Sequence, residues 1–364
     1  MSFLHIAYHF HDLASHAACS GQGDAARDFI EHAYTAAMME EASGKIAFKI
    51  RPSQEMGHLA SEEHASVRVT GAGVLFAASA RLLDNSCLAY ERLGLTGYLF
   101  SAVASRLGNT GCYEGIADIG DGTDLGDYSR ICYSSGQPRN ILVPDPFFFI
   151  SRNYAGLRRF VATRSRPWSE RKGTLFWRGT TTGRRTRTPG PDDDLYMDWS
   201  WLPRLHLCAA GRRSIHADKI DIALTQMDQI AEPYLKDAIR TAGLIKPMVS
   251  KETFADYKYL IDIDGYSNAW SLLEKMIMGA TIFKVASPHG FRQWYYDRLT
   301  PWETHVPVAS DLSDLDERMD WAMNNPRACA QIAEQAARVA ADISFDAAIS
   351  DAIAAASAGL TRVI

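Results

Sequence analysis

Residues 257–279 read Tyr257-Lys-Tyr-Leu-Ile-Asp-Ile-Asp-Gly265-Tyr-Ser-Asn-Ala-Trp-Ser-Leu-Leu-Glu-Lys-Met-Ile-Met-Gly279. The first part is an apolar run typical of a buried strand, and Gly265 permits a sharp turn after it. The second part has the spacing of an amphipathic helix, whose first turn offers unpaired N–H groups to an anion. Ser267 and Asn268 are expected to cap this helix or to donate to a ligand. The stretch predicts a phosphate-binding strand, turn and helix, with a core strand joined to a helix by an ordinary loop as the alternative.

The neighbouring segments repeat the alternation of strand and helix. A second strand is expected at Ala280–Ala286, and a strand at Gly173–Gly179 precedes a helix near Pro203–Ala210 and a strand near Lys219–Leu224. Such alternation predicts a parallel sheet covered by helices. Ligands of these α/β sheets lie at the carboxyl ends of the strands.

The rest of the chain mixes helix and strand. We expect a first domain over residues 1–160, a second over 161–345, and a last helix over 346–364 that crosses back to the first domain. The pattern predicts a helix at Asp24–Ala42, strands at Ser66–Thr70, Gly73–Ala77, Gly115–Gly122 and Asn140–Pro146, and final helices at Leu312–Asn324, Arg327–Ala341 and Asp346–Ala358.

Composition narrows the class of protein. A chain of 364 residues with 47% hydrophobic residues is long enough for two ordinary cores. The six cysteines are scattered without a Cys-x-x-Cys pair, so neither a zinc site nor a dense disulfide framework is indicated. We see no leader sequence and no apolar run of the roughly 20 residues that span a bilayer. A cytoplasmic protein is expected, with peripheral contact at the inner membrane surface through arginines as a further expectation.

Basic residues crowd the segment 158–187, although the net charge of the chain is −5. Within it, the turn Trp177-Arg178-Gly179 ends a predicted strand with a guanidinium group next to a glycine. A planar and permanently charged donor suits a diphosphate. A structural salt bridge of Arg178 is the alternative, and for the segment as a whole the alternative is a solvated surface strip.

Aspartates cluster in the first half of the chain, at Asp118, Asp121 and Asp124, where a predicted strand ends. A carboxylate in this position has the chemistry of a general base. Capping of turns by aspartate side chains is the alternative explanation.

Asp262 and Asp264 form an Asp-x-Asp pair, a pattern that holds a divalent cation in many sugar-nucleotide enzymes. On a strand the two side chains would point the same way, and without a metal they would repel a phosphate. We prefer the hypothesis that Asp262 and Asp264 bind no metal ion, and no cofactor is expected. His289 and His305 occur singly and no Gly-x-Ser-x-Gly appears, so a metalloprotease or a serine hydrolase is not favoured.

Several of these motifs together resemble glycosyltransferase family 90, which includes protein O-glucosyltransferases, fungal capsule xylosyltransferases and bacterial lipopolysaccharide-modifying proteins. The resemblance covers about residues 110–325 in one consistent order. The residues that carry it are Ile141–Pro146, Phe176–Thr180, Tyr257–Gly265 with the Ser/Asn helix start, Ser287, Trp294–Asp297, Leu299–Trp302, His305–Val308 and Asp311–Leu315.

The resemblance implies a GT-B-like α/β fold, in which two Rossmann-like domains face each other across a cleft. It further implies that the C-terminal domain holds a UDP-sugar and that transfer is inverting and independent of metal. An aspartate of the N-terminal domain would deprotonate the acceptor hydroxyl. Asp121 fits this role better than Asp118, which we place among the substrate-binding residues.

The resemblance also assigns donor contacts. Arg178, Gly179 and Thr180 match the aromatic-Arg-Gly motif, and Arg204 best matches the arginine that neutralises the leaving diphosphate. That placement makes residues 181–202 an insertion, so Arg184, Arg185 and Arg187 stay competitors for the role. The other expected donor contacts are Gly265, Tyr266, Ser267, Asn268, Ser271 and Lys275.

One departure from the family pattern concerns Ser271, since animal members carry an arginine at the comparable position. The expected activity is transfer of a sugar to a glycan or lipid-linked glycan of the surface polysaccharide or lipopolysaccharide type, by a bacterial-type member. The alternative is a noncatalytic glycan- or nucleotide-binding module, supported by the missing arginine. A nucleic-acid partner is not expected, because the chain is acidic overall and carries no recognised motif.

Overall fold

The computed structural model describes residues 47–53, 63–71, 73–85, 87–108, 110–194 and 198–363. Contacts divide them into two compact units. Unit 1 holds the described residues up to Asn153 together with Phe291–Trp294 and Ser344–Ile364, and unit 2 holds Tyr154–Gly290 and Tyr295–Ile343. The helix expected at Asp24–Ala42 lies outside the described residues, and the predicted domain limits stay a prediction.

Unit 1 is built on a mixed sheet with the strand order β1-β3-β2-β4-β5-β6, to which β12 adds beside β4. Its strands are β1 (Ala47–Ser53), β2 (His64–Thr70), β3 (Gly73–Ser79), β4 (Cys112–Asp118), β5 (Ile131–Cys132), β6 (Ile141–Leu142) and β12 (Thr361–Arg362). β2 runs antiparallel to both β3 and β4, whereas β4, β5 and β6 are parallel. The antiparallel β2 distinguishes this sheet from the purely parallel one that a Rossmann-like domain would have.

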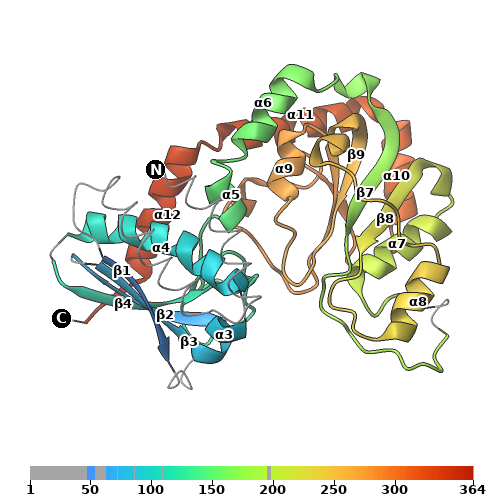
Figure 1. The fold of residues 1–364 in the computed structure, drawn as a ribbon. Helices are drawn as coiled ribbons and strands as arrows, with labels where there is room; N and C mark the ends of the chain where they lie inside the picture. Colours follow the sequence, from blue (N-terminus) through green and yellow to red (C-terminus); the bar gives the residue numbers. More distant parts are fainter. Residues whose placement is uncertain are drawn as a thin grey trace. The chain divides into compact units, whose positions relative to one another are not determined.

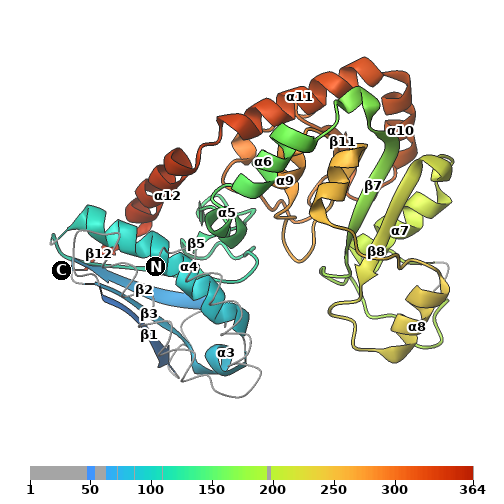
Figure 2. The same ribbon diagram turned by 45° about the horizontal axis from the view of Figure 1, so that its top comes forward.

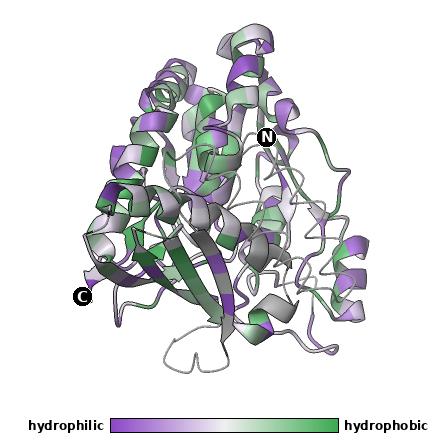
Figure 3. Cartoon of the chain, turned by 60° about the vertical axis from the view of Figure 1, so that its left-hand side comes forward, coloured by the Kyte–Doolittle hydropathy of each residue, from purple (hydrophilic) through white to green (hydrophobic). Residues whose placement is uncertain are grey.

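Alternation of side chains fixes one buried face of this sheet. Val67 and Val69 of β2 are buried with Phe76 of β3, and Phe76 packs edge-on against Phe100 with the ring centroids 5.6 Å apart. Phe100 belongs to α4 (Cys87–Leu107), the long helix that lies along the sheet in Figure 1. Several strands of unit 1 are green in Figure 3, in keeping with this buried apolar face.

In the described residues of unit 1, three further helices are α3 (Ala80–Asn85), α5 (Pro146–Ile150) and α12 (Phe345–Gly359). Asp145 caps α5, since its side chain accepts hydrogen bonds from the backbone N–H groups of Phe147 and Phe148. The chain returns to this unit at its end, where α12 packs against α4 and β6.

Unit 2 contains a sheet of five parallel strands in the order β11-β10-β9-β7-β8. The strands are β7 (Lys172–Thr180), β8 (Ile220–Gln226), β9 (Tyr257–Asp262), β10 (Thr281–Val285) and β11 (Val306–Val308). Helices alternate with them as α6 (Ala155–Arg164), α7 (Pro203–Arg213), α8 (Pro233–Thr241), α9 (Leu272–Ile277), α10 (Leu315–Asn324) and α11 (Pro326–Asp342). Short 3₁₀ helices lie at η2 (Trp168–Glu170), η3 (Ala217–Lys219), η4 (Lys251–Asp256) and η5 (Tyr296–Arg298).

Both faces of this sheet are buried, as expected for a parallel sheet. Trp177 and Tyr259 face a core built with α7, α8 and α10. Their chain neighbours Phe176 and Leu260 face a smaller core that includes Ala255 of η4 and packs against α6. In Figure 2, α7 and α8 lie on one side of β7 and β8, and α6 and α9 lie on the other.

Most elements expected from the sequence are confirmed where the structure describes them. The exceptions are the helix start after Gly265 and the strand at Asn140–Pro146, which forms only over Ile141–Leu142. The strands at Ser66–Thr70, Gly73–Ala77 and Gly173–Gly179 and the three final helices all form, with boundaries shifted by a few residues. The mixed α/β class with parallel strands is confirmed as well. The described part of the chain contains no helix long and apolar enough to cross a membrane.

Candidate functional site

The sheet of unit 2 has a topological switch point between β7 and β9. From β7 the chain moves outward to β8, and it then returns to the other side of β7 to form β9, β10 and β11 in turn. Connections that leave neighbouring strands in opposite directions open a crevice at the carboxyl ends of those strands, where α/β proteins bind ligands. The carboxyl ends of β7 and β9 carry Arg178–Thr180 and Asp262–Gly265, two of the predicted donor-binding segments.

Arg204, in the first turn of α7, reaches this switch point. Its Nε donates to the Asp264 carbonyl at 3.3 Å, and its Nη1 donates to the Thr180 carbonyl at 3.4 Å and to the Thr182 hydroxyl. The guanidinium therefore joins the end of β7 to the end of β9. It also lies over the indole of Trp177, with Cζ 5.8 Å from the ring centroid.

The two glycines predicted here are required for close approach. A Cβ atom on Gly265 would lie 2.8 Å from Nη2 and 3.1 Å from Cζ of Arg204. A Cβ atom on Gly179 would lie 2.3 Å from the Trp177 indole. Both positions need the absence of a side chain so that Trp177 and Arg204 can occupy their places.

Arg178 forms a structural salt bridge, which the sequence analysis left open as the alternative to a diphosphate contact. Its Nη2 donates to both carboxylate oxygens of Asp221 at 2.9 Å, and Lys246 Nζ lies 2.7 Å from the same carboxylate. This bidentate pair bridges β7 and β8 and partly neutralises the guanidinium. The predicted contact of Arg178 with a diphosphate is therefore weaker than that of Arg204.

The loop arginines differ from one another. Arg185 pairs with Glu232 at 2.7 Å, and Arg187 pairs with Asp193 and Asp198 at 2.7 and 3.0 Å. These pairs tie both side chains to carboxylates of unit 2. Arg184 instead reaches the switch point, where it contacts Tyr266.

Tyr266 contacts Arg184 in two ways. Its carbonyl accepts a hydrogen bond from Arg184 Nε at 3.0 Å, and the Arg184 Cζ lies 5.0 Å from its ring centroid. The Tyr266 side chain is exposed. Arg184 and Arg204 thus contact the Asp264–Tyr266 segment, and the switch point carries two guanidinium groups.

The turn after β9 differs from the expectation. Ser267 and Asn268 were expected to cap a helix or to donate to a ligand. The capping prediction is wrong, because α9 begins at Leu272 with Ser271 as its N-cap, while donation to a ligand stays a prediction. The backbone N–H of Gly265 donates to the Ser267 carbonyl at 2.8 Å, which closes a turn and delays the helix. Ser267 and Asn268 are both buried in this turn.

The Asp-x-Asp pair is buried beneath the switch point. Lys275 Nζ lies 2.5 Å from Asp262 Oδ1, and both side chains are almost fully buried, at 4% and 0% exposure. Burial raises the pKa of Asp264 to about 6, while Ser287, Lys284 and Arg204 nearby oppose the rise. A lysine ammonium therefore occupies the position beside Asp262 where a cation would be expected, and the predicted contact of Lys275 with a ligand stays a prediction.

A cavity of about 210 Å³ lies beside these residues in unit 2. Its lining includes the predicted residues Arg178, Ser271 and Lys275, with the aromatic ring of Phe254 and the hydroxyl-bearing Thr225. The lysines of its wall are paired, since Lys275 contacts Asp262 and Lys251 contacts Glu274 at 2.6 Å. An aromatic wall with compensated charges suits a flat neutral ring.

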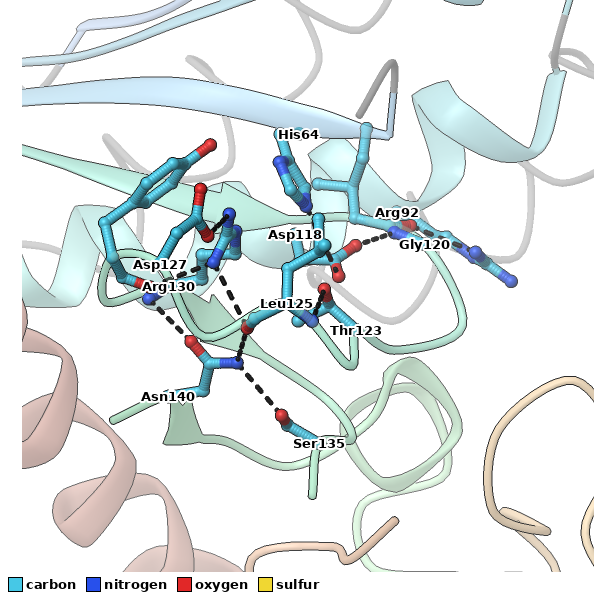
Figure 4. Close-up of polar contacts among 12 residues, drawn as sticks. His64, Arg92, Asp118, Gly120, Thr123, Leu125, Asp127, Arg130, Ser135 and Asn140 are labelled. Atoms are coloured by element: carbon cyan, nitrogen blue, oxygen red, sulfur yellow. Dashed lines mark hydrogen bonds and ion pairs between the residues drawn. The ribbon is translucent and has the colours of Figure 1, made fainter. Parts of the chain in front are cut away.

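In unit 1, the carboxylates predicted as base candidates follow the end of β4. Asp118 is buried, and its Oδ1 accepts the Gly120 N–H at 2.7 Å (Figure 4). Burial raises the pKa of Asp118 to about 7 and lowers the pKa of the neighbouring His64 to about 4. His64 Nε2 lies 3.8 Å from Asp118 Oδ2, and neither side chain is fully charged at neutral pH.

Asp121 lies three residues after Asp118 in this turn and is accessible. Its side chain is 42% exposed and pairs with Arg92 of α4, whose side chain is 10% exposed. Glu63 is close to both, because Arg92 and Asp121 act electrostatically on its carboxyl group. Arg92, His64 and Glu63 were missed by sequence reasoning, because none of them lies in a motif and only the tertiary structure brings them to this turn.

The loop that follows is held by a buried arginine. Arg130 is fully buried and donates to the carbonyls of Leu125 and Tyr128 at 3.2 and 2.9 Å. Asn140 donates to the same Leu125 carbonyl and to Ser135 Oγ, each at 2.9 Å (Figure 4). These bonds give the loop after Asp121 a fixed shape. Among the residues that the structure describes, no group of three or more His, Cys, Asp or Glu side chains is placed to hold a metal ion.

Comparison with known proteins identifies related sequences. The family model described as glycosyl transferase family 90 matches residues 202–348, a range that includes Arg204, Gly265 and Lys275. Uncharacterized protein 035R of invertebrate iridescent virus 3 is 29% identical over 230 residues, which cover 61% of this chain and 18% of that protein. Protein O-glucosyltransferase 3 of Rattus norvegicus is 32% identical over 154 residues, which cover 40% of this chain and 29% of that protein.

The chain spans less than a third of the length of these two relatives. They come from a virus and an animal, and they give no support to the expectation of a bacterial-type member. Among solved structures, Anabaena HepE in complex with UDP-glucose is similar with a TM-score of 0.33 and 11% identity, over 57% of this chain and 52% of that one. A TM-score of this size does not establish a common fold. The sequence matches support a relationship between this chain and glycosyl transferase family 90.

Proposed function

We propose that this chain is a glycosyltransferase of family 90 that moves a sugar from a UDP-sugar to a hydroxyl group, with inversion and without a metal ion. The acceptor that we propose is a glycan or lipid-linked glycan of the surface polysaccharide type. The observation that supports this most directly is the position of Arg204, which joins the carboxyl ends of β7 and β9 at the switch point.

The donor diphosphate is assigned to this edge of the sheet. Arg204 and Arg184 contact the Asp264–Tyr266 segment there, and two guanidinium groups match the charge of a diphosphate. Charge that builds up on the departing UDP is stabilised by donors that are already in position. The cavity beside Phe254 and Ser271 is assigned to the uracil ring, because its wall is aromatic and its lysines are paired.

The acceptor chemistry is assigned to Asp121. In a single displacement, Asp121 takes the proton of the acceptor hydroxyl, the acceptor oxygen bonds to the anomeric carbon, and the bond from that carbon to the UDP oxygen breaks. An accessible carboxylate is suited to meet a hydroxyl from solvent, whereas Asp118 is buried. Asp118 is assigned the supporting role of holding the turn through Gly120.

We propose a mechanism without a metal ion because Lys275 lies beside Asp262. Its ammonium group lies 2.5 Å from Asp262, so the Asp-x-Asp pair already has an internal cation. The noncatalytic alternative relied on the basic loop as a docking surface. Arg185 and Arg187 of that loop pair with Glu232, Asp193 and Asp198, which weakens the alternative.

Calorimetry with UDP tests the proposal, first in EDTA and then with added manganese. We expect binding in EDTA that manganese leaves unchanged. Binding that requires manganese would return the role to Asp262 and Asp264, and an absence of binding in both conditions would contradict the proposed function.

The substitution Arg204→Ala tests the residue that carries the proposal. We expect UDP release from UDP-glucose to fall by on the order of a hundredfold or more, the usual scale for loss of one electrostatic stabiliser. Arg187→Ala is the matched control, because this arginine pairs with Asp193 and Asp198 in its own loop, and its rate should stay within about twofold of the unsubstituted protein. Equal rates for Arg204→Ala and the unsubstituted protein would transfer the role to Arg184.

A further inference from the structure

Arg92 is a buried cation that no sequence motif indicates. It lies on α4, 29 residues before Asp121, and its side chain is 10% exposed. A buried guanidinium loses hydration, so its position has to be justified by the groups that it contacts.

The contacts of Arg92 span the turn after β4. Nη1 donates to the Ile119 carbonyl at 3.0 Å, and Nη2 donates to Asp121 Oδ1. The fork of one guanidinium therefore holds the backbone at residue 119 and the carboxylate at residue 121. A planar fork of this kind fixes orientation as well as distance, which a lysine ammonium does not.

The helix that carries Arg92 is itself fixed to the same loop. Thr96, one turn further along α4, donates to the Arg92 carbonyl at 2.6 Å and shares a hydrogen bond of 2.5 Å with the Tyr133 hydroxyl. Thr96 and Tyr133 are both buried. Arg92 and Thr96 thus hold the loop of residues 119–133 at both ends, and this limits the movement of the guanidinium.

Two further carboxyl groups, those of Glu63 and Asp118, lie close to the turn that Arg92 holds. Glu63 and Asp118 lie against Gly120, where an added Cβ atom would be 2.2 Å from Glu63 Oε2 and 3.0 Å from Asp118 Oδ1. Arg92 opposes the rise that burial causes in the pKa of both carboxyl groups, and Arg130 does so for Asp118. Without Arg92, Asp121 would be repelled by Glu63 and could turn toward solvent.

We propose that Arg92 is the positioning residue for Asp121, and that it holds the carboxylate in the orientation from which it takes a proton. This inference rests on the proposed function of Asp121 as the base. Arg92 touches neither donor nor acceptor in this proposal and acts only through the aspartate. It should consequently change the rate of the chemical step and leave donor affinity unchanged.

The test uses Arg92→Met, Arg92→Lys and Arg92→Ala in the full chain. UDP release from UDP-glucose, with water as the acceptor, gives kcat and KM, calorimetry gives the affinity for UDP, and thermal melting reports the fold. For Arg92→Met we expect kcat to fall by on the order of a hundredfold, the scale for a displaced catalytic group, with UDP affinity within about twofold. We expect methylguanidinium to restore part of the lost rate in Arg92→Ala, and Arg92→Lys to retain more rate than Arg92→Met.

Arg68→Met is the matched control, because Arg68 forms an ion pair with Glu114 across β2 and β4 at a distance of 2.5 Å. It should leave kcat unchanged. Loss of rate in Arg92→Met that follows only its melting temperature, without recovery by methylguanidinium or lysine, would make Arg92 structural and overturn the inference. Unchanged kcat in Arg92→Met would overturn it too, while the proposed function would stand.

Failure of the proposed function is recognised separately. An unsubstituted protein that binds no UDP and releases none from UDP-glucose, UDP-xylose, UDP-galactose or UDP-N-acetylglucosamine contradicts the proposed function. The inference about Arg92 then falls with it.

Discussion

Gly265 has a role that its place in a turn does not reveal. Gly265 does not adopt a positive φ, and its importance lies in the space that a side chain would take from Arg204. The Arg204 Nη2 atom would lie 2.8 Å from an added Cβ atom, a distance at which one of the two groups must move.

The substitution Gly265→Ala is therefore expected to displace Arg204 and weaken UDP binding by roughly tenfold or more, a scale reached by small misplacements of a ligand-binding group. The melting temperature should change little, because the methyl group meets a side chain and not the backbone. Gly156→Ala in α6 is the control, since an added Cβ atom there has no neighbour within 4 Å. Calorimetry on both variants gives the comparison, and equal UDP affinity for Gly265→Ala and Gly156→Ala would refute this role.

At the scale of elements, β9 and α9 are joined by the buried pair of Asp262 and Lys275. Both side chains are inaccessible, at 0% and 4% exposure, so water cannot compensate either charge alone. Removal of one partner of a buried ion pair leaves an uncompensated charge, and that costs more than the pair itself contributes.

We expect Lys275→Met to lower the free energy of unfolding by about 3–5 kcal/mol. The double variant Asp262→Leu with Lys275→Met should recover part of this loss, since it removes the buried carboxylate, although Lys284 Nζ, 4.0 Å from Asp262 Oδ2, then loses that partner. Lys219→Met is the control, because Lys219 and its partner Asp218 are both exposed, at 52% and 73%, and its cost should be within about 1 kcal/mol. Urea unfolding measures all three, and a cost for Lys275→Met no larger than that of the control would be inconsistent with a buried pair.

At the scale of the whole molecule, buried aspartates and histidines have opposite effects on pH dependence, Asp118 and His64 in unit 1 and Asp264 and His305 in unit 2. Burial raises the pKa of Asp118 to about 7 and of Asp264 to about 6, so the folded state binds more protons than the unfolded state above pH 4. These two groups make stability fall as the pH rises from about 4 to 7. Burial lowers the pKa of His64 and His305 to about 4, so their contribution rises between pH 4 and 6.5.

The contributions oppose each other up to about pH 6.5, and above it the carboxyl groups alone lower the stability. We therefore expect Asp118→Asn to gain in melting temperature relative to the unsubstituted protein when the pH rises from 5 to 8. The amide can still accept the hydrogen bond from Gly120 but never ionises. Asp127→Asn is the control, because the hydrogen bond from Arg130 lowers the pKa of that exposed aspartate, so the carboxylate stays ionised in the folded and the unfolded state from pH 5 to 8 and its difference in melting temperature should not change with pH. A difference between Asp118→Asn and the unsubstituted protein that does not grow with pH would contradict this account.

The local elements could be predicted because their signals are local. The period of two in Ser66–Thr70 and the apolar run at Tyr257–Asp262 each report which faces are buried, and both became strands. The helix start at Ser267 could not be predicted, because a hydrogen bond from Gly265 to the Ser267 carbonyl closes a turn that capping statistics do not capture. The antiparallel direction of β2 could not be predicted either, because strand direction depends on which strands pair.

The sequence by itself determined the α/β class and four of the five parallel strands of unit 2, because periodicity and glycine placement act over a few neighbouring residues. Only the tertiary structure decided what each charged side chain does. Arg178 and Arg204 are indistinguishable as arginines near a strand and a helix, yet one pairs with Asp221 and the other joins the strand ends. Charge pairing acts through space, so Arg92 meets Asp121, and Lys275 meets Asp262, only after the chain has folded.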